Sequence, residues 1–314
     1  MKVAVVIVNW NSGEYLERCL CALEKQELLP SKVIIVDNCS NDDSLLAAEN
    51  ARISTVVLRL PENVGFARAN NLALSECKDI DWVATLNADA FADPRWLMEL
   101  MQATINCPEY SFFASCMLKD TNTDLYDGAG DNYFISGLAK RRNYLKRYVP
   151  EENQSREVFA PCAAAALYRK DAWQEVGGFD EDFFCFFEDV DLGFRLRLKG
   201  HKCLYVADAM VRHVGGGLTE NVSSSVVMYG HRNLVWTYFK NMPLPLLLAF
   251  LPVHALVNLV SIAYFLTTPQ RSAILQSKWQ ALAALRKFLA KRSETQPGRI
   301  SSMTLLSSMT WRLW

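Results

Sequence analysis

Buried strands and amphipathic helices alternate through the first hundred residues, and this alternation limits the folds open to the chain. Apolar, largely β-branched runs lie at Val3–Val8, Val33–Val36, Thr55–Leu60 and Asp81–Leu86. The segment after the first run has leucines on one helical face, at Leu16, Leu20 and Leu23. This pattern predicts an α/β domain with a Rossmann-like, mostly parallel sheet flanked by helices. No G-x-G-x-x-G follows the first run and no G-x-x-x-x-G-K-[ST] occurs, which disfavours dinucleotide and P-loop sites.

Two acidic residues follow predicted strands. Asp37 ends the second run, and Asp89 follows the fourth in Asn87-Ala-Asp89. Because ligands of open parallel sheets bind at the carboxyl ends of strands, Asp37 could accept hydrogen bonds from a base or ribose. Asp89 could coordinate a hard divalent ion that bridges a diphosphate. The alternative for both residues is a turn or capping role.

A stretch of acids and aromatics runs from Gly178 to Gly200. It turns into a helical pattern, and three acids fall at the predicted helix start: Glu188, Asp189 and Asp191. These acids could simply cap the helix and compensate its dipole. The phenylalanines just before them could instead form an apolar wall that raises a carboxylate pKa, which would suit a general base.

The middle of the chain is less regular. Periodicity weakens between Lys119 and Glu157, where the basic run Ala139–Arg147 reads either as a solvated loop or as a contact for an anionic acceptor. Strands are expected again at Ala163–Tyr168 and Lys202–Val206. The lone His213 precedes three glycines, and it could be a structural histidine or a metal ligand.

The last part of the chain changes character, and we expect a domain of residues 1–240 followed by a separate region of residues 241–314. Pro243–Thr268 is almost uniformly apolar, which favours interfacial or re-entrant membrane helices over a buried helix pair. Beyond Pro269 there are eight Lys or Arg residues against Glu294 alone, a balance that suits an anionic cytoplasmic leaflet. Ser293–Gly298 reads as a flexible linker.

Net charge and cysteine content further restrict the classes of protein to which the chain could belong. The net charge of −1 gives no global case for nucleic acid binding. Nine cysteines include no C-x-x-C pair, so neither a zinc site nor a disulfide framework is indicated, and reduced cytosolic thiols fit best. The N-terminal apolar run is too short for a signal peptide, and we expect no export.

Six short motifs, in order, resemble the family 2 inverting glycosyltransferases with a GT-A fold, especially their bacterial rhamnosyltransferase-like branch. The resemblance covers roughly residues 2–240 and rests on Val8-Asn-Trp-Asn11, Val36-Asp-Asn38, Asn63-Val-Gly-Phe-Ala-Arg-Ala-Asn-Asn71, Leu86-Asn-Ala-Asp89, Gly177-Gly-Phe-Asp180 and Phe187-Glu-Asp-Val-Asp-Leu192. It implies transfer of a sugar from a nucleotide donor to an acceptor hydroxyl with inversion at the anomeric carbon.

The resemblance also implies roles for single residues. Asp37 would contact the uracil or thymine of a UDP- or dTDP-sugar, and the motif residues expected around the donor are Asn9, Asn11, Asn38, Asn63, Gly65, Asn70 and Asn87. Asp89, with His213, would bind Mg²⁺ or Mn²⁺ against the diphosphate. Asn87 replaces the first acid of the family's Asp-x-Asp motif, which weakens metal affinity. Asp189 would be the catalytic base, with Glu188 and Asp191 orienting the acceptor or the helix.

Two other functions remain open on sequence grounds. A sugar-1-phosphate nucleotidyltransferase would share the sheet but needs a glycine-rich, basic N-terminal signature that is absent here. An inactive relative could bind a nucleotide sugar and act as a scaffold. The resemblance favours a transferase of cell-surface polysaccharide or lipopolysaccharide synthesis, with a saccharide or polyprenyl-diphosphate-linked acceptor. We expect it on the inner face of the cell membrane.

Overall fold

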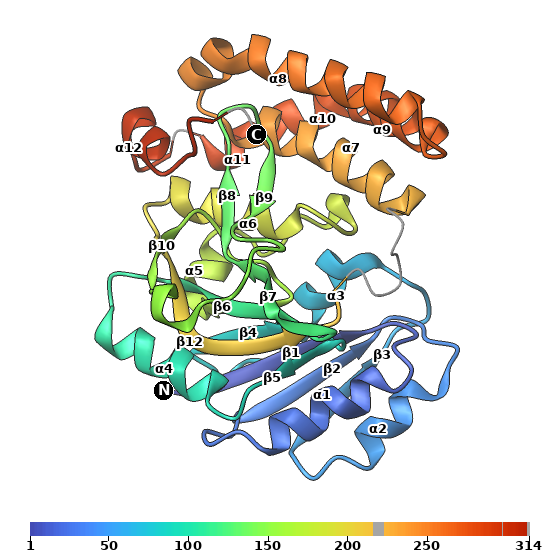
Figure 1. The fold of residues 1–314 in the computed structure, drawn as a ribbon, viewed down its shortest axis with the longest axis vertical. Helices are drawn as coiled ribbons and strands as arrows, with labels where there is room; N and C mark the ends of the chain where they lie inside the picture. Colours follow the sequence, from blue (N-terminus) through green and yellow to red (C-terminus); the bar gives the residue numbers. More distant parts are fainter. Residues whose placement is uncertain (216–222, 297, 313–314) are drawn as a thin grey trace.

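A ten-stranded mixed sheet forms the centre of the protein in a computed structural model, which describes residues 1–215, 223–296 and 298–312 (Figure 1). Its strand order is β10-β12-β6-β11-β4-β1-β2-β3, with β5 paired to β12 and β7 paired to β6. The bounds of these strands are β1 Val3–Asn9, β2 Lys32–Asp37, β3 Thr55–Arg59, β4 Trp82–Leu86, β5 Ala90–Ala92, β6 Phe112–Lys119, β7 Asn122–Ala129, β10 Arg156–Val158, β11 Ala165–Arg169 and β12 Cys203–His213.

The α/β class is confirmed, but the sheet is parallel only in part. β3, β2, β1 and β4 are parallel neighbours, and β12 runs parallel to β6. β11 lies antiparallel between β4 and β6, so β4 and β6 run in the same direction and β11 alone runs against both of its neighbours at the centre of the sheet. The strand expected at Lys202–Val206 is longer than predicted and continues to His213 as β12, whose register against β6 shifts between Val206 and Met210.

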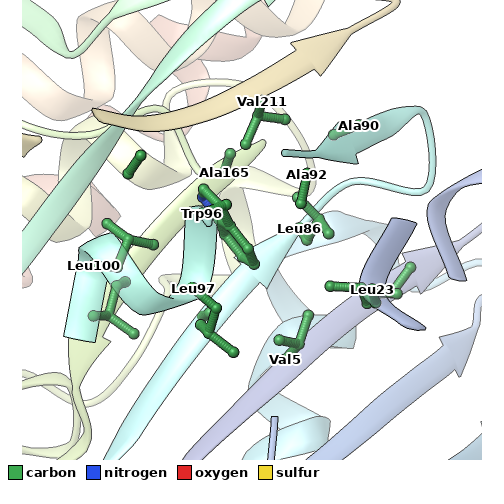
Figure 2. Packing of buried hydrophobic residues seen from close by; sticks show 14 of the residues in the cluster. Val5, Leu23, Leu86, Ala90, Ala92, Trp96, Leu97, Leu100, Ala165 and Val211 are labelled. Carbon is green, nitrogen blue, oxygen red and sulfur yellow. The ribbon is translucent and has the colours of Figure 1, made fainter. Parts of the chain in front are cut away.

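Helices cover both faces of the sheet. One face packs against α1 and α4, and Figure 2 shows Trp96, Leu97 and Leu100 of α4 over the strands. The other face packs against α3, α5 and α6. The bounds of the helices before residue 200 are α1 Tyr15–Glu24, α2 Leu46–Glu49, α3 Gly65–Ala73, α4 Trp96–Asn106, α5 Lys170–Glu175 and α6 Glu188–Leu198. Short 3₁₀ turns lie at Asp43–Leu45, Leu74–Glu76, Pro150–Glu152 and Glu181–Phe183.

The irregular middle of the chain forms a second, two-stranded sheet. It consists of β8, Asp131–Tyr133, and β9, Ala139–Arg141. In Figure 1 this hairpin rises from the large sheet toward the C-terminal helices. The basic run is therefore a solvated loop only in part, because it begins with a strand and its Arg141 forms an ion pair with the buried Asp127.

Six helices from residue 224 onward form a layer that lies across one end of the domain (Figure 1). Their bounds are α7 Ser224–Asn241, α8 Leu244–Leu266, α9 Arg271–Ala283, α10 Leu285–Ala290, α11 Arg292–Thr295 and α12 Ser302–Ser307. The linker expected at Ser293–Gly298 is wrong at its start, because α11 continues to Thr295, a buried residue whose hydroxyl bonds to backbone carbonyls.

α8 is the one helix in the described part of the chain long and apolar enough to cross a membrane, by length and composition. Its buried side chains are Leu246, Leu247, His254 and Val257, which face the protein. The opposite side is exposed, and Leu248, Leu259 and Tyr264 are each about 60% or more accessible. α8 thus has one face toward the protein and one apolar face toward the surroundings.

The basic surplus of the tail is largely engaged within the protein. Lys287 and Lys291 pair with Asp182, and Arg299 pairs with Glu175. Two further cations, Lys278 and Arg292, donate hydrogen bonds to oxygen atoms of neighbouring helices. Fewer cations are therefore available for an anionic surface than their count in the sequence indicated.

Candidate active site

The fold brings Asp89 and His213 together, although 124 positions separate them in the chain. Asp89 follows β4, and His213 ends β12, where it pairs with Ala90 of β5. The Nε2 atom of His213 lies 3.3 Å from Oδ1 of Asp89. Its Nδ1 atom donates to Oδ2 of Asp127, 2.8 Å away.

Asp127, at the end of β7, is a site residue that sequence reasoning missed. It is fully buried, and besides His213 it pairs with Lys119 at 2.9 Å and with Arg141. Burial alone would raise the pKa of this carboxyl, but the bonds from His213 and the charge of Arg141 hold it well below its ordinary value. Asp127 is therefore a carboxylate that fixes the ring of His213. No sequence signal marked it, since it lies in a polar segment without a recognisable motif.

The pair of Asp89 and His213 fits a divalent metal. Nε2 of His213 is buried and forms no well-aligned hydrogen bond with a described residue, although Oδ1 of Asp89 lies 3.3 Å away, so one ion could contact both atoms. Its other nitrogen is held by a carboxylate, the arrangement that usually orients a metal-binding histidine. No group of three or more His, Cys, Asp or Glu residues in the described ranges could hold an ion alone. A metal here would thus take its remaining ligands from a bound diphosphate.

Asn9 and Asp37, two of the residues predicted to lie around the nucleotide-sugar donor, meet at the ends of β1 and β2. Nδ2 of Asn9 donates to Oδ1 of Asp37 at 2.9 Å and also contacts the hydroxyls of Ser40 and Ser44. Asp37 is 7% exposed, and its other oxygen accepts a long bond from the Ser40 amide, 3.4 Å away. The carboxylate therefore keeps bonding capacity at the strand edge.

Asn38 and Asn63 form a second pair beside the first. Nδ2 of Asn38 donates to Oδ1 of Asn63 at 2.9 Å, and its Oδ1 accepts from the Val64 amide at 2.8 Å. The Gly65 amide donates to Oδ1 of Asn63. Gly65 has φ of +84°, and a Cβ there would lie 2.5 Å from the ring of Phe184. These bonds shape the turn that enters α3, and only glycine fits its tightest point.

The other residues predicted to lie around the nucleotide-sugar donor have different surroundings from one another. Asn11 has φ of 49° and accepts the Asn41 amide, which joins the first two βα turns. The backbone of Asn87 bonds to Ala164 just before Asp89. Asn70 is buried inside α3, where it donates to the carbonyl of Phe66. The Asn70 side chain is thus engaged within α3, where its hydrogen bond stabilises the helix, and it is not exposed to a ligand.

Asp189 lies at the start of α6, as predicted, and both of its oxygens accept backbone amides. Oδ2 accepts from Ala163 at 3.0 Å, and Oδ1 from Val190 at 2.8 Å. Burial raises the pKa of this carboxyl, while the two amides and the nearby Arg141 act in the opposite direction. The side chain retains some exposure. A reachable carboxyl with a raised pKa can accept a proton.

The acids on either side of Asp189 have different surroundings. Glu188 is buried, and its Oε2 has no hydrogen-bond partner in the described part of the chain. Burial and the neighbouring Asp189 raise the pKa of Glu188 well above its ordinary value. Asp191 is fully buried and accepts bonds from Arg195, Lys240 and Asn241, so it joins α6 to α7.

Asp131 of β8 and Arg141 of β9 interact electrostatically with both Asp127 and Asp189, and sequence reasoning missed both residues. The two residues are register partners in the hairpin. Burial and the charge of Asp189 raise the pKa of Asp131 to about 7. Although burial disfavours its charge, Arg141 has a raised pKa because it interacts with the carboxylates of Asp127, Asp131 and Asp189. One guanidinium therefore lies among the acids of both halves of the site.

The sequence profile described as "Glycosyltransferase like family 2" matches residues 1–238. The chain belongs to this family. Its curated relatives include the N-acetylglucosaminyl-diphospho-decaprenol L-rhamnosyltransferase of Mycobacterium tuberculosis, 29% identical over 230 residues that cover 67% of this chain and 75% of the relative. Rhamnosyltransferase WbbL of Escherichia coli is 28% identical over 218 residues, which cover 65% of this chain and 80% of the relative.

Solved glycosyltransferase structures share the fold of this family 2 protein at low sequence identity. GalNAc-T7 with UDP, GalNAc and Mn²⁺ has a TM-score of 0.64 at 16% identity, covering 94% of this chain and 58% of that chain. Staphylococcus aureus TarS residues 1–349 have a TM-score of 0.58 at 15% identity, covering 99% and 93%. The expected GT-A fold is confirmed, and so is the expectation that the protein is a glycosyltransferase.

Proposed function

We propose that this glycosyltransferase transfers rhamnose, with inversion, from a dTDP- or UDP-linked donor to a saccharide acceptor carried on a polyprenyl diphosphate. The observation that carries the proposal is the position of Asp189. Its two oxygens are held by the Ala163 and Val190 amides, and Arg141, which pairs with the carboxylate that orients His213, also acts on Asp189 through its charge. These observations support a site in which Asp189 accepts the proton and Asp89 and His213 hold the diphosphate through a metal.

The residues divide the chemistry between them. Asp37 and Asn38, at the end of β2, would accept and donate hydrogen bonds to the base of the nucleotide. Asp89 and His213 would hold Mg²⁺ or Mn²⁺, which when bound offsets the charge of the departing diphosphate. Asp189 would remove the proton from the acceptor hydroxyl as that oxygen attacks the anomeric carbon on the face opposite the leaving group. One displacement of this kind inverts the anomeric configuration and needs no covalent sugar intermediate.

The choice of rhamnose and of a lipid-linked acceptor follows the curated relatives. The Mycobacterium tuberculosis relative is named for rhamnosyl transfer to a diphospho-decaprenol acceptor, and other relatives from Salmonella are O-antigen chain rhamnosyltransferases. These names support a role in cell-surface polysaccharide or lipopolysaccharide synthesis.

A lipid-linked acceptor would place the protein on the inner face of the cell membrane, bound peripherally. The exposed face of α8 supports this location, together with Trp279 and Leu282 of α9, which are 70% and 67% exposed. An exposed apolar surface of this extent typically marks a partner or a bilayer. We therefore propose that residues 241–314 form a membrane-associating region beside a catalytic domain of residues 1–240.

Calorimetric titration with a panel of nucleotide sugars tests the donor and the metal together. We expect one donor to bind in the presence of Mn²⁺ and to lose that metal-dependent binding in Asp89→Ala, whereas Asp79→Ala, an exposed acid before β4, should bind normally. Anomeric assignment of the transferred sugar by NMR would then test inversion. Absence of binding to every donor, with and without Mn²⁺, would overturn the proposal.

A further inference from the structure

The turn Phe184–Phe187, which leads into α6, has an unusual backbone. Phe184, Phe186 and Phe187 have φ values of 65°, 67° and 66°. The left-handed region is unfavourable for residues with a Cβ, and phenylalanine lacks the short polar side chain that lets asparagine occupy it. Such conformations persist only where the surroundings impose them, and they concentrate at ligand-binding sites.

Asn233 of α7 donates hydrogen bonds to the backbone of this turn. Its Nδ2 atom lies 3.0, 2.9 and 2.7 Å from the carbonyl oxygens of Phe183, Cys185 and Phe186. Nε of Arg232 donates to Oδ1 of Asn233 at 2.9 Å, which fixes the orientation of the amide so that its nitrogen faces the turn. Asn233 is fully buried. The two N–H groups of one amide therefore lie within hydrogen-bond distance of three carbonyls of the strained segment, and Arg232 also donates to one of them, that of Phe183.

The other side of the turn is fixed to α3, the helix that follows the Asn63 turn. The Ala67 amide donates to the carbonyl of Phe184 at 3.2 Å. Gly65 allows the Phe184 ring to approach the α3 backbone so closely that any Cβ at Gly65 would overlap it. The turn is thus held between the donor-side helix and α7, and it continues directly into Glu188 and Asp189.

The turn presents aromatic rings to the surroundings. Phe186 is 38% exposed, and Phe184 stacks on Tyr229 with ring centroids 5.3 Å apart and planes inclined by 23°. Phe183, one residue earlier, is fully buried against Trp236 and Phe288. The chain therefore has a buried anchor at Phe183 and partly open rings at Phe184 and Phe186, five and three residues before the proposed base.

We infer that this turn is the contact surface for the acceptor sugar, and that Asn233 is the residue that positions it. This inference rests on the proposed function, because a base can take a proton only from a hydroxyl within hydrogen-bond distance, and the sugar that carries it must lie beside Asp189. The C–H face of a pyranose ring is apolar and flat, so it packs on aromatic rings such as Phe186 and the Phe184–Tyr229 pair.

Steady-state kinetics of the full-length protein test the surface. The donor would be dTDP-rhamnose and the acceptor probe an N-acetylglucosaminyl-diphospho-prenol of short chain length. Phe186→Ala should raise the acceptor KM about tenfold without changing the donor KM, and Phe186→Trp should restore it. Ile105→Ala, which removes an exposed apolar side chain at the end of α4, should leave both constants unchanged.

A second pair of variants tests the positioning role. Asn233→Ala should lower kcat about tenfold or more with donor binding intact, because the start of α6 loses its support. Adding Phe186→Gly to Asn233→Ala should recover kcat, since glycine adopts the left-handed backbone freely, while the acceptor KM stays high because the ring is gone. A purely structural role would not separate kcat from KM in this way.

The outcomes separate the two proposals. If Phe186→Ala has the same acceptor KM as Ile105→Ala, the proposal that the turn contacts the acceptor sugar is overturned. If Asn233→Ala has a normal kcat, the proposal that Asn233 positions the turn is overturned. If Asn233→Ala does not fold, the Phe186 variants decide. A wild-type protein that binds no nucleotide sugar would instead overturn the proposed function, and this inference with it.

Discussion

Removal of the Lys240 charge should destabilise the protein far more than removal of a comparable surface charge. Lys240 is 1% exposed, and its Nζ lies 2.7 Å from Asp180 and 2.9 Å from Asp191. Breaking a buried ion pair by deleting one partner typically costs about 3–5 kcal/mol, because the other charge stays buried. Each acid keeps other partners here, Lys291 for Asp180 and Arg195 for Asp191, so we expect Lys240→Met to cost about 3 kcal/mol.

Lys287→Met is the matched control. Its Nζ also lies 2.7 Å from a carboxylate, that of Asp182, but its side chain is 58% exposed. Exposed ion pairs contribute about 0–1 kcal/mol, so this variant should be nearly as stable as the wild type. Equilibrium urea unfolding of the three proteins gives the two differences directly. Equal losses in Lys240→Met and Lys287→Met would refute the reasoning that burial decides the contribution.

Three further variants probe the site. Asp189→Asn should lower turnover roughly a hundredfold or more with donor affinity retained in calorimetry, and near-normal turnover would contradict its role as the base. Asp127→Asn should weaken Mn²⁺ affinity about 10- to 100-fold in a titration with donor present, because the ring of His213 loses its orienting carboxylate; unchanged affinity would exclude that role. Asp131→Asn should flatten the pH dependence of unfolding. With the folded pKa near 7 and the unfolded value near 4, the folded state holds the extra proton between these values, so wild-type stability should fall as pH rises through this window, by at most about 1.4 kcal/mol per unit. Urea unfolding at several pH values measures it, and identical slopes in both proteins would contradict this origin.

The local pattern of the sequence was sufficient for the first half of the sheet. β1 to β4 are short apolar runs separated by helices, so their identity and parallel order follow from periodicity and from the usual βαβ connection. The position of β11 between β4 and β6 could not be predicted in this way. β11 pairs with β4, which lies about eighty positions earlier in the chain. No local signal in the sequence specifies that an antiparallel strand lies beside the parallel strands β1 to β4.

The same limit applies to the site. Asp89 and Asp189 lie in recognisable motifs, and the resemblance to a family identified them. Asp127, Asp131 and Arg141 lie in the stretch where periodicity weakens, and they come together only when β7 and the β8–β9 hairpin form. Two arginines of α6, Arg195 and Arg197, also acquire their surroundings only in the folded protein. Both are buried and donate to carbonyl or carboxylate oxygens, because α6 is covered on more than one side.

The fold gives the six acids between Gly178 and Gly200 different surroundings, and these support the proposal of Asp189 as the base. Four of them form ion pairs. Asp180, Asp182 and Asp191 pair with lysines from residues 240–291, and Glu181 pairs with Arg68. Glu188 has no cation within ion-pair distance in the described part of the chain, but it is buried. Asp189 has no lysine or arginine within ion-pair distance in the described part of the chain, both of its oxygens accept backbone amides, and the residue keeps some exposure, so it is the acid best placed to take a proton from an acceptor hydroxyl. If Asp189 is the base, the lysines of the C-terminal helices would contribute to catalysis indirectly, because they neutralise the acids whose charge would otherwise surround it. Loss of these helices should disturb the site itself as well as any attachment to a membrane.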